Sequence, residues 1–226
     1  MNFSKFNNII LIISLLLIIN ACNKEQIYKP LTVTDIDKNV YNTVQIGEQI
    51  WMIENLKVTK YKNGEDIPNV TNDSVWLHTW TGAYCNYEHF DNNGEIYGRL
   101  YNWFVISDSR GICPDGWHVP TKEEWEILID YLGGSEIAGG KMKEIGTDHW
   151  ISPNTGATNE SGFTGLPGGG WFLSFDGIGE GGYWWTSTDR SDIGTYGWWL
   201  SYKNTLTSST SRDKRMGFSI RCIKDK

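Results

Sequence analysis

The segment CPDGWHVPTKEEWEIL, residues 113–128, restricts the fold more than any other part of this chain. Pro120 disfavours helix before it, and Thr121 and Glu124 have the spacing of a capping box, in which each side chain hydrogen-bonds the other residue's backbone amide. Apolar side chains then recur at helical spacing, at Trp125, Leu128, Ile129 and Leu132. The segment predicts a helix that begins after Thr121, buries one apolar face and ends at Gly133-Gly134.

The rest of the domain reads as short strands broken by Gly, Asn and Asp. Residues 43–58 predict two strands around a Gly47-Glu48 turn, and DNNGE at 91–95 predicts another turn. GRLYNWFVI at 98–106 fits either strand or helix, whereas 135–142 predicts a second short helix. The chain then becomes loop-rich and ends in strands around YWWTST, WWLSY and GFSIRCI. Two helices in the middle, bracketed by antiparallel strands and long loops, indicate a single α+β domain.

The amino terminus has the pattern of an export signal, with Lys5 followed by an apolar run from Ile9 to Ile19. The run is shorter than the about 20 apolar residues of a transmembrane helix, which favours removal after export. Its end resembles the lipobox of bacterial lipoproteins, which implies cleavage after residue 21 and lipidation of Cys22 with diacylglyceryl and acyl chains such as palmitate. An ordinary cleaved signal with a chance cysteine is the alternative.

The lipobox resemblance also suggests where the protein resides. Lipid on Cys22 implies attachment to a membrane through acyl chains alone. Asn23 stands where an inner-membrane retention signal would have Asp, so we expect the outer membrane, with either periplasmic or cell-surface display. Lys24-Glu25 faintly resembles the surface-export signal of Bacteroidota lipoproteins. Residues 1–21 are thus predicted to be signal peptide, 22–37 a lipidated flexible tether and 38–226 one domain.

Charge and cysteine content fit an exported domain. The formal charge of −7 argues against a nucleic-acid partner, which requires a basic surface. With Cys22 assigned to lipid, the remaining Cys85, Cys113 and Cys222 indicate one disulfide and one free thiol outside the cytosol. We expect Cys113 to pair with Cys222, because that bond would tie the middle of the domain to its last strand and contribute roughly 4–5 kcal/mol. Cys85 would then be free and buried.

No group of residues has a recognisable catalytic or metal-binding pattern. There is no CxxC and no matched histidine pair for zinc, and TGLPGGGW lacks the Lys-Ser/Thr of a phosphate loop. Glu123, Glu124 and Glu126 lie in a first helical turn, where acidic side chains complement the dipole. Asp148-His149 has no GxSxG serine to activate. We therefore expect no catalytic residue, no metal and no cofactor.

Several segments, taken together, resemble one protein family. They are IGEQIWMIENLKVTKYKNGEDIP, YGRLYNWF, CPDGWHVPTKEEWEIL, ATNESGFTGLPGGG, YWWTST and GFSIRCIKD, in this order. The chain from 38 to 226 is identified by them as a member of the Fibrobacter succinogenes major paralogous (FISUMP) domain family. That family occurs on exported and lipid-anchored proteins of Bacteroidota and Fibrobacterota, and the resemblance implies no general enzymatic activity.

The family is in turn similar to the C-type-lectin-like fold, which formylglycine-generating enzymes share. In that fold a cysteine at the first helix pairs with one on the last strand, which implies the same Cys113–Cys222 pair. The EPN and WND motifs of calcium-dependent lectins do not occur here, and only Cys222 lies where the formylglycine-generating enzymes have a redox pair. Neither activity is expected, since function depends on the site rather than on the fold.

Two runs of adjacent aromatic residues near the carboxyl end are the candidate ligand contacts, Tyr183-Trp184-Trp185 and Trp198-Trp199. Neighbours on a strand point to opposite faces, so one ring of each run could face outward and stack on a sugar or anchor a protein. The alternative is that these rings fill the core. The sequence thus predicts a lipid-anchored binding or adhesion module for glycan or protein. The alternatives are an enzyme acting on cell-envelope or polysaccharide material and a structural envelope component.

Overall fold

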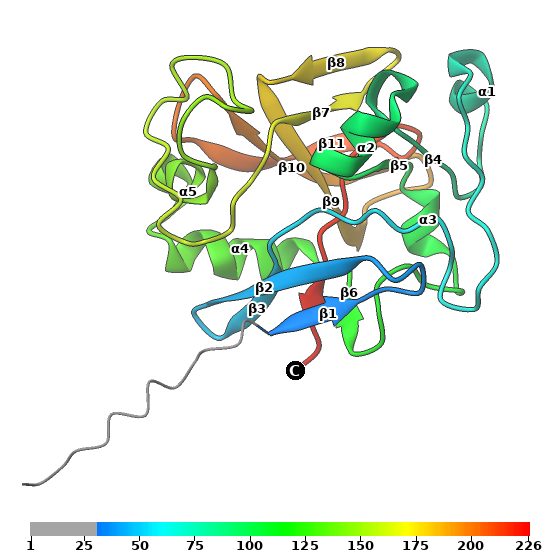
Figure 1. The fold of residues 1–226 in the computed structure, drawn as a ribbon, viewed down its shortest axis with the longest axis horizontal. Helices are drawn as coiled ribbons and strands as arrows, with labels where there is room; N and C mark the ends of the chain where they lie inside the picture. The colour runs from blue at the N-terminus through cyan, green and yellow to red at the C-terminus, as the bar shows by residue number, and fades with distance from the viewer. Residues whose placement is uncertain (1–30) are drawn as a thin grey trace, which may run out of the picture.

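The computed structural model describes residues 31–226 (Figure 1). The predicted signal peptide and the lipidation site Cys22 lie outside these residues, as does most of the predicted tether. The end of that tether range is not a free linker, because Thr32–Thr34 forms strand β1 and pairs with the next strand. The folded domain therefore includes residues before 38. None of the helices formed by residues 31–226 is long and apolar enough to cross a membrane.

The lower sheet in Figure 1 joins both ends of the domain. Its order is β1 (Thr32–Thr34), β2 (Val40–Ile46), β3 (Gln49–Met52), β12 (Ile223–Lys224) and β6 (Trp117–His118), all antiparallel. The predicted hairpin turn is confirmed: Gly47 connects β2 and β3 with φ of 62°, a conformation that glycine adopts without strain. The last strand lies between the N-terminal hairpin and β6, which immediately precedes the central helices.

The upper sheet carries most of the carboxyl-terminal half. Its order is β11 (Thr207–Asp213), β10 (Gly194–Ser201), β9 (Gly181–Asp189), β7 (Gly168–Trp171) and β8 (Phe175–Ile178). All pairings are antiparallel except that of β7 with β9. The strands expected around YWWTST and WWLSY are confirmed as β9 and β10. GFSIRCI is largely irregular, because only Ile223 of it belongs to β12.

The two helices predicted for the middle of the chain are confirmed as α4 (Lys122–Tyr131) and α5 (Ser135–Met142). The capping box is formed as expected: the Glu124 amide donates to Thr121 Oγ1 at 3.1 Å, and the Thr121 amide donates to Glu124 Oε2 at 2.8 Å. The predicted apolar face of α4 is buried, with Trp125, Leu128, Ile129 and Leu132 all in the core. A local sequence signal thus determines this element.

Three further short helices were not predicted: α1 (Asp73–Leu77), α2 (Asp91–Tyr97) and α3 (Phe104–Ser107). The turn expected at residues 91–95 is wrong, because these residues form the first turns of α2. Gly94 there lies so close to Asn86 that a Cβ would collide with the Asn86 Oδ1 atom. The ambiguous segment 98–106 contains both structures, since the two-stranded sheet β4 (Tyr84–Cys85) with β5 (Leu100–Tyr101) precedes α3.

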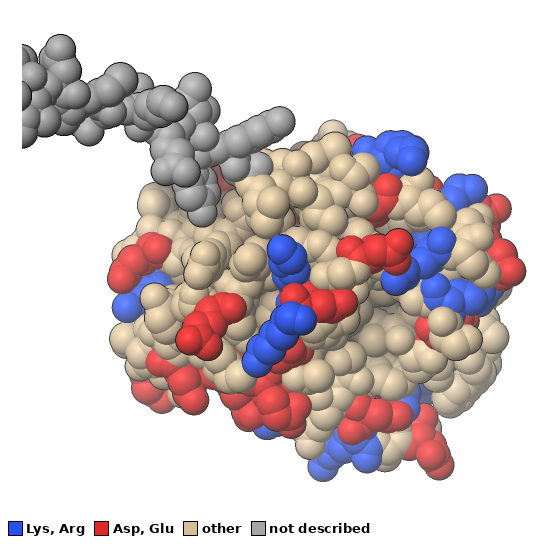
Figure 2. Space-filling view, turned by 90° about the horizontal axis from the view of Figure 1, so that it is seen from below, with Lys and Arg blue, Asp and Glu red and all other residues tan. Residues whose placement is uncertain are grey.

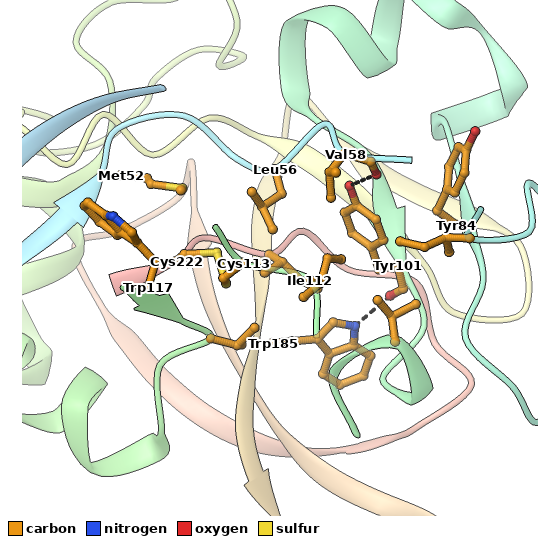
Figure 3. Close-up of a cluster of buried hydrophobic side chains, with 14 of the residues drawn as sticks. Met52, Leu56, Val58, Tyr84, Tyr101, Ile112, Cys113, Trp117, Trp185 and Cys222 are labelled. Carbon is orange, nitrogen blue, oxygen red and sulfur yellow. Dashed lines mark hydrogen bonds between the residues drawn. A yellow bond between two sulfur atoms is a disulfide. The ribbon is translucent and has the colours of Figure 1, made fainter. Parts of the chain in front are cut away.

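The core consists of buried clusters on both sides of the upper sheet. Figure 3 shows the one that contains the predicted disulfide, which is confirmed between Cys113 and Cys222. Two polar groups of this cluster bond to backbone carbonyls: Trp185 Nε1 donates to the Tyr101 carbonyl at 2.7 Å, and the Tyr101 hydroxyl donates to the Val58 carbonyl at 2.7 Å. The other cluster packs α4 and α5 against the opposite face of β9 and β10.

The secondary-structure content makes the domain mostly β, with five α-helices among the described residues. The predicted α+β class is therefore correct only in a coarse sense: helices and strands are both present, but α1, α2 and α3 alternate with short strands along the chain. Strands dominate because the carboxyl-terminal half, expected to be rich in loops and short strands, forms long ones, and β9 alone has 9 residues.

Candidate ligand-binding surface

Most of the aromatic residues proposed as ligand contacts are in the core. Trp184, Trp185 and Trp198 are 1%, 0% and 5% exposed, so none of these three rings can stack on a ligand. The reason is that the upper sheet is covered on both faces along this stretch. Trp184 and Trp198 pack on Trp125 of α4, with ring centroids 6.3 and 5.9 Å away, and Trp185 packs on Phe218 at 4.4 Å.

The remaining two candidates, Tyr183 and Trp199, lie together at the surface. They are directly opposite each other on β9 and β10, both are half-buried, and their side chains share one face of the upper sheet. Phe172 extends this pair, since its ring centroid is 5.0 Å from that of Tyr183 in an edge-on arrangement. The structure therefore keeps one residue of each predicted aromatic run as a surface candidate.

Strand β11 adds polar groups to the same face. The register places Ser208 opposite Trp199, Thr210 opposite Gly197 and Arg212 opposite Thr195. Trp199 Nε1 donates to Ser208 Oγ at 3.1 Å, which fixes the indole beside the hydroxyl. We call this group the aromatic face; its members are Phe172, Tyr183, Trp199, Ser208, Thr210 and Arg212.

Arg212 is unusual among the six arginines of the chain. It is half-buried, with its guanidinium carbon 5.8 Å from the ring centroid of Phe172 and 5.9 Å from that of Phe218. Within residues 31–226 its side chain has no hydrogen bond and no ion pair, whereas Arg190 is exposed to solvent and the others are hydrogen-bonded, namely Arg99, Arg110, Arg215 and Arg221. Burial lowers the pKa of the Arg212 guanidinium, and the nearby Tyr183 phenol opposes part of that effect.

An apolar groove of about 220 Å³ adjoins the aromatic face. It is lined by Leu77, Trp171, Phe172, Leu173, Asp213, Arg215 and Met216. Phe172 belongs to both features and connects them. Leu173, in the turn between β7 and β8, is 72% exposed and adds an apolar side chain to the rim of the groove.

Arg215, which lines the groove, also contacts Trp80, a residue that the sequence did not single out. Trp80 is 53% exposed, and its ring packs on Phe104 at 5.9 Å and under the Arg215 guanidinium at 5.0 Å. Its only sequence signal was its position in a polar segment, between Thr79 and Thr81, outside any apolar periodicity. We call the larger region formed by Trp80, the groove and the aromatic face the aromatic surface.

The charges around the groove are mostly paired. Arg215 binds Asp213 through two hydrogen bonds of 3.0 and 2.6 Å. This hydrogen bonding lowers the pKa of Asp213 and raises that of Arg215. Elsewhere acidic and basic side chains lie interspersed, as Figure 2 shows for the face seen from below. A half-buried guanidinium with neither an ion pair nor a hydrogen bond among residues 31–226, such as that of Arg212, stands out against this pattern.

The other residues considered for catalysis have structural partners. His149 Nδ1 lies 2.8 Å from Glu144 Oε2, and His118 lies between Glu124 and Asp225. Cys85 is free and buried, as predicted, and burial raises the pKa of its thiol far above the usual range. In residues 31–226 no three His, Cys, Asp or Glu side chains are placed to hold a metal ion.

The glycine run considered as a phosphate loop is strand β7. Gly169, with φ of 63°, leaves no room for a Cβ, which would lie 2.7 Å from the Asp176 carbonyl oxygen. The glycines therefore permit close backbone packing with β8.

Comparison with known proteins identifies the family. Nothing matches the chain among the curated proteins or the solved structures that were compared. The model of the Fibrobacter succinogenes major domain matches residues 44–224, which contain β3 through β11, the disulfide and the whole aromatic surface. This match agrees with the resemblance carried by the sequence motifs and covers most of the chain. The chain therefore belongs to the Fibrobacter succinogenes major domain family.

Proposed function

We propose that this protein is an exported, lipid-anchored protein of the outer membrane whose domain binds a glycan through the aromatic surface without catalysing a reaction. The observation that carries the proposal is the half-exposed pair Tyr183 and Trp199, flanked by the Ser208 hydroxyl and by Arg212, which has no ion pair among residues 31–226. Aromatic rings offer the apolar faces of sugars a stacking partner, and hydroxyl and guanidinium groups supply hydrogen bonds.

A binding role fits the groove better than an enzymatic one. Glycosidases use two carboxyl groups that face each other across the substrate. The groove is lined by a single carboxylate, Asp213, and both of its oxygens are engaged by Arg215. Such an ion pair orients a surface but does not provide a general acid and base.

The finer fold assignment is also part of the proposal. We infer a C-type-lectin-like arrangement because α4 and α5 precede the β9–β10–β11 antiparallel sheet and because a disulfide joins the segment before α4 to the last strand. Both termini of the described domain lie in one sheet, which is compatible with that fold.

Saccharide binding is tested with the full mature chain, solubilised in detergent, on an array of envelope and plant polysaccharides. Trp199→Ala and Trp80→Ala should each weaken binding by roughly tenfold, since a stacked aromatic ring contributes on the order of 1–2 kcal/mol. Phe90→Ala, which removes another exposed ring outside the aromatic surface, is the control and should bind like the wild type.

Absence of saccharide binding by the folded wild-type chain would contradict the glycan proposal. Capture of a specific envelope protein that depends on Trp80 and Trp199 would instead assign the surface to a protein ligand. An enzymatic role would require turnover of one of the arrayed polysaccharides, detected as released oligosaccharide.

Lipid anchoring is tested separately in the producing cells. Labelled palmitate should be incorporated into the wild-type chain and lost in Cys22→Ser, while Cys85→Ser retains it. Protease treatment of intact cells then distinguishes display on the cell surface from display in the periplasm. Label retained in Cys22→Ser would refute the lipobox interpretation.

A further inference from the structure

The aromatic face has features that restrict the chemistry of its ligand. We propose that this ligand is an acidic saccharide, whose carboxylate binds Arg212 while its sugar ring packs on Tyr183 and Trp199. The inference rests on the proposed glycan-binding function and narrows the ligand to saccharides that contain uronic acid. It is argued from the lack of a partner for Arg212, from the groups beside it and from the net charge of the chain.

Arg212 lacks the partner that a half-buried guanidinium normally has. Its planar group offers five N–H donors, and within residues 31–226 none of them is used. The neighbouring Asp213 does not serve, because consecutive residues on β11 point to opposite faces and Asp213 is bound to Arg215. A carboxylate arriving on the aromatic face would meet two parallel donors, the arrangement that makes arginine–carboxylate pairs strong.

The groups around Arg212 match a sugar better than a peptide. Ser208 accepts a hydrogen bond from Trp199 Nε1, and its own O–H has no acceptor among the described residues, so it can donate to a ligand oxygen. Thr210 lies between Ser208 and Arg212 on the same face, but its hydroxyl is buried, so Ser208 and Arg212 are the polar groups that a ligand can reach. A uronic acid presents an apolar ring face, hydroxyls and one carboxylate within a single residue. The aromatic rings, the Ser208 hydroxyl and the Arg212 guanidinium complement these three groups.

The net negative charge of the chain makes non-specific binding of an acidic polymer unfavourable. A chain with a net charge of −7 repels polyanions at long range, so an acidic polymer will not adhere to it without a specific contact. An anion held here must therefore be held by local hydrogen bonds. Of the arginines, Arg212 alone combines partial burial with unused donors and contact with aromatic rings.

The test compares each acidic polysaccharide with its own carboxyl-reduced form, in which every carboxylate is converted to a neutral CH₂OH. Polygalacturonate, alginate and hyaluronate, with their reduced forms, are titrated into the full mature chain by calorimetry. At least one acidic polymer should bind about tenfold or more tightly than its reduced form, as expected for a charge-assisted hydrogen bond. Arg212→Gln should abolish this preference while binding of the reduced form stays within about twofold.

Controls separate loss of the contact from loss of the fold. Arg190→Gln makes the same charge change at an exposed site on the turn after β9 and should keep the preference. Arg212→Lys keeps the charge but not the paired donors, and should retain only part of it. Thermal unfolding of each variant shows whether it is folded; if Arg212→Gln is not, the lysine variant and the reduced polymers still decide the question.

Four outcomes would overturn the inference. Equal affinity for the acidic and reduced forms would refute the carboxylate contact, and so would a preference for the acidic form that survives Arg212→Gln. In both cases, binding that still depends on Trp199 would support the glycan-binding function. Binding of poly-glutamate through Arg212, without saccharide binding, would assign the site to an acidic peptide. Absence of binding to any polysaccharide would refute both the inference and the proposed function.

Discussion

At the scale of single residues, Lys143 is a buried charge that backbone carbonyls hold in place of a counter-ion. Lys143, fully buried, donates from Nζ to the carbonyls of Thr155, Ser201 and Asn204 at 2.8, 2.9 and 2.9 Å. Burial lowers the pKa of Lys143 to about 8, so the ammonium is still mostly protonated at pH 7. One side chain thereby ties the end of α5 to two distant loops.

Replacing Lys143 should therefore be costly. Lys143→Met keeps much of the side-chain volume but leaves three carbonyl groups without donors, and we expect the free energy of unfolding to fall by about 3 kcal/mol or more. Urea denaturation measures the change. Lys141→Met, which removes a solvent-accessible ammonium 3.5 Å from Glu160, is the matched control and should cost less than about 1 kcal/mol. Equal losses would show that the carbonyl contacts of Lys143 contribute little.

His118 gives the stability a defined pH dependence. Burial opposes the charged imidazolium, but hydrogen bonds to Asp225 and Glu124 outweigh it and raise the pKa of His118 above its usual value. The folded state therefore binds the proton more tightly than the unfolded state. The resulting stabilisation is complete below about pH 6.5, the unfolded value, and is lost as pH rises through the higher folded value.

We expect the melting temperature of the wild type to fall as pH rises through this window, and His118→Gln to remove that part of the slope. Differential scanning calorimetry from about pH 5 to 9 measures both profiles. His78→Gln is the control, because the exposed His78 ring contacts only the Ser74 carbonyl. A wild-type slope that persists in His118→Gln would assign the effect to other groups.

At the scale of secondary-structure elements, the sequence predicted those helices and strands whose stabilising contacts lie within a short segment of the chain. The α4 helix was predictable because its capping box and apolar face lie within residues 121–132. Helix α2 was not, because DNNGE favours a turn by composition and becomes helical only when Asn86 and Arg99 pack around Gly94. It was predictable that adjacent side chains of β9 and β10 point to opposite faces of the sheet. Burial of both faces was not predictable, because it depends on which other elements cover the sheet.

Helix α5 offers a test in which helix propensity and packing have opposite effects. Gly139→Ala in a helix interior normally gains about 1 kcal/mol. Here the new Cβ would lie 2.7 Å from the backbone oxygens of Thr205 and Leu206, so we expect a net loss of about 1–3 kcal/mol. Thermal unfolding measures it, with Glu136→Ala on the exposed side of α5 as the control. Stabilisation by Gly139→Ala would mean that the loop after β10 moves aside at little cost.

At the scale of the whole molecule, the disulfide is the main covalent constraint. Cys113 and Cys222 are 109 residues apart, and in the chain-entropy model closing such a loop stabilises the fold by about 4–5 kcal/mol. The double variant Cys113→Ala with Cys222→Ala should lose that amount, measured by chemical denaturation under non-reducing conditions. Cys85→Ala, a buried thiol without a bond, should lose about 1 kcal/mol. Similar losses would show that packing, rather than cross-linking, dominates.

The features of the whole molecule that could be predicted from the sequence are those that depend on short motifs and on the cysteine count. The cysteine count and the family resemblance predicted the disulfide, and the order of segments predicted one domain with central helices. The candidate surface was only half predicted: Tyr183 and Trp199 were named, but Arg212, Phe172 and Trp80 were not. Arg212 was identified by its unused hydrogen-bond donors, Phe172 by its place in both the groove and the aromatic face, and Trp80 by its exposed ring. Each of these properties depends on the neighbours of the residue in three dimensions, which cannot be inferred from the sequence.

The position of the disulfide also determines how the domain responds to force. The closed loop from 113 to 222 contains α4, α5 and β7–β11, and with them Phe172, Tyr183, Trp199 and Arg212. If the predicted N-terminal anchor and the proposed ligand contact are both correct, a cell held through this face would pull on the loop at one end and on the amino terminus of the domain at the other. Tension can unravel residues 31–112, but the covalent ring limits extension of residues 113–222, so the part that carries the proposed binding face is protected from mechanical unfolding.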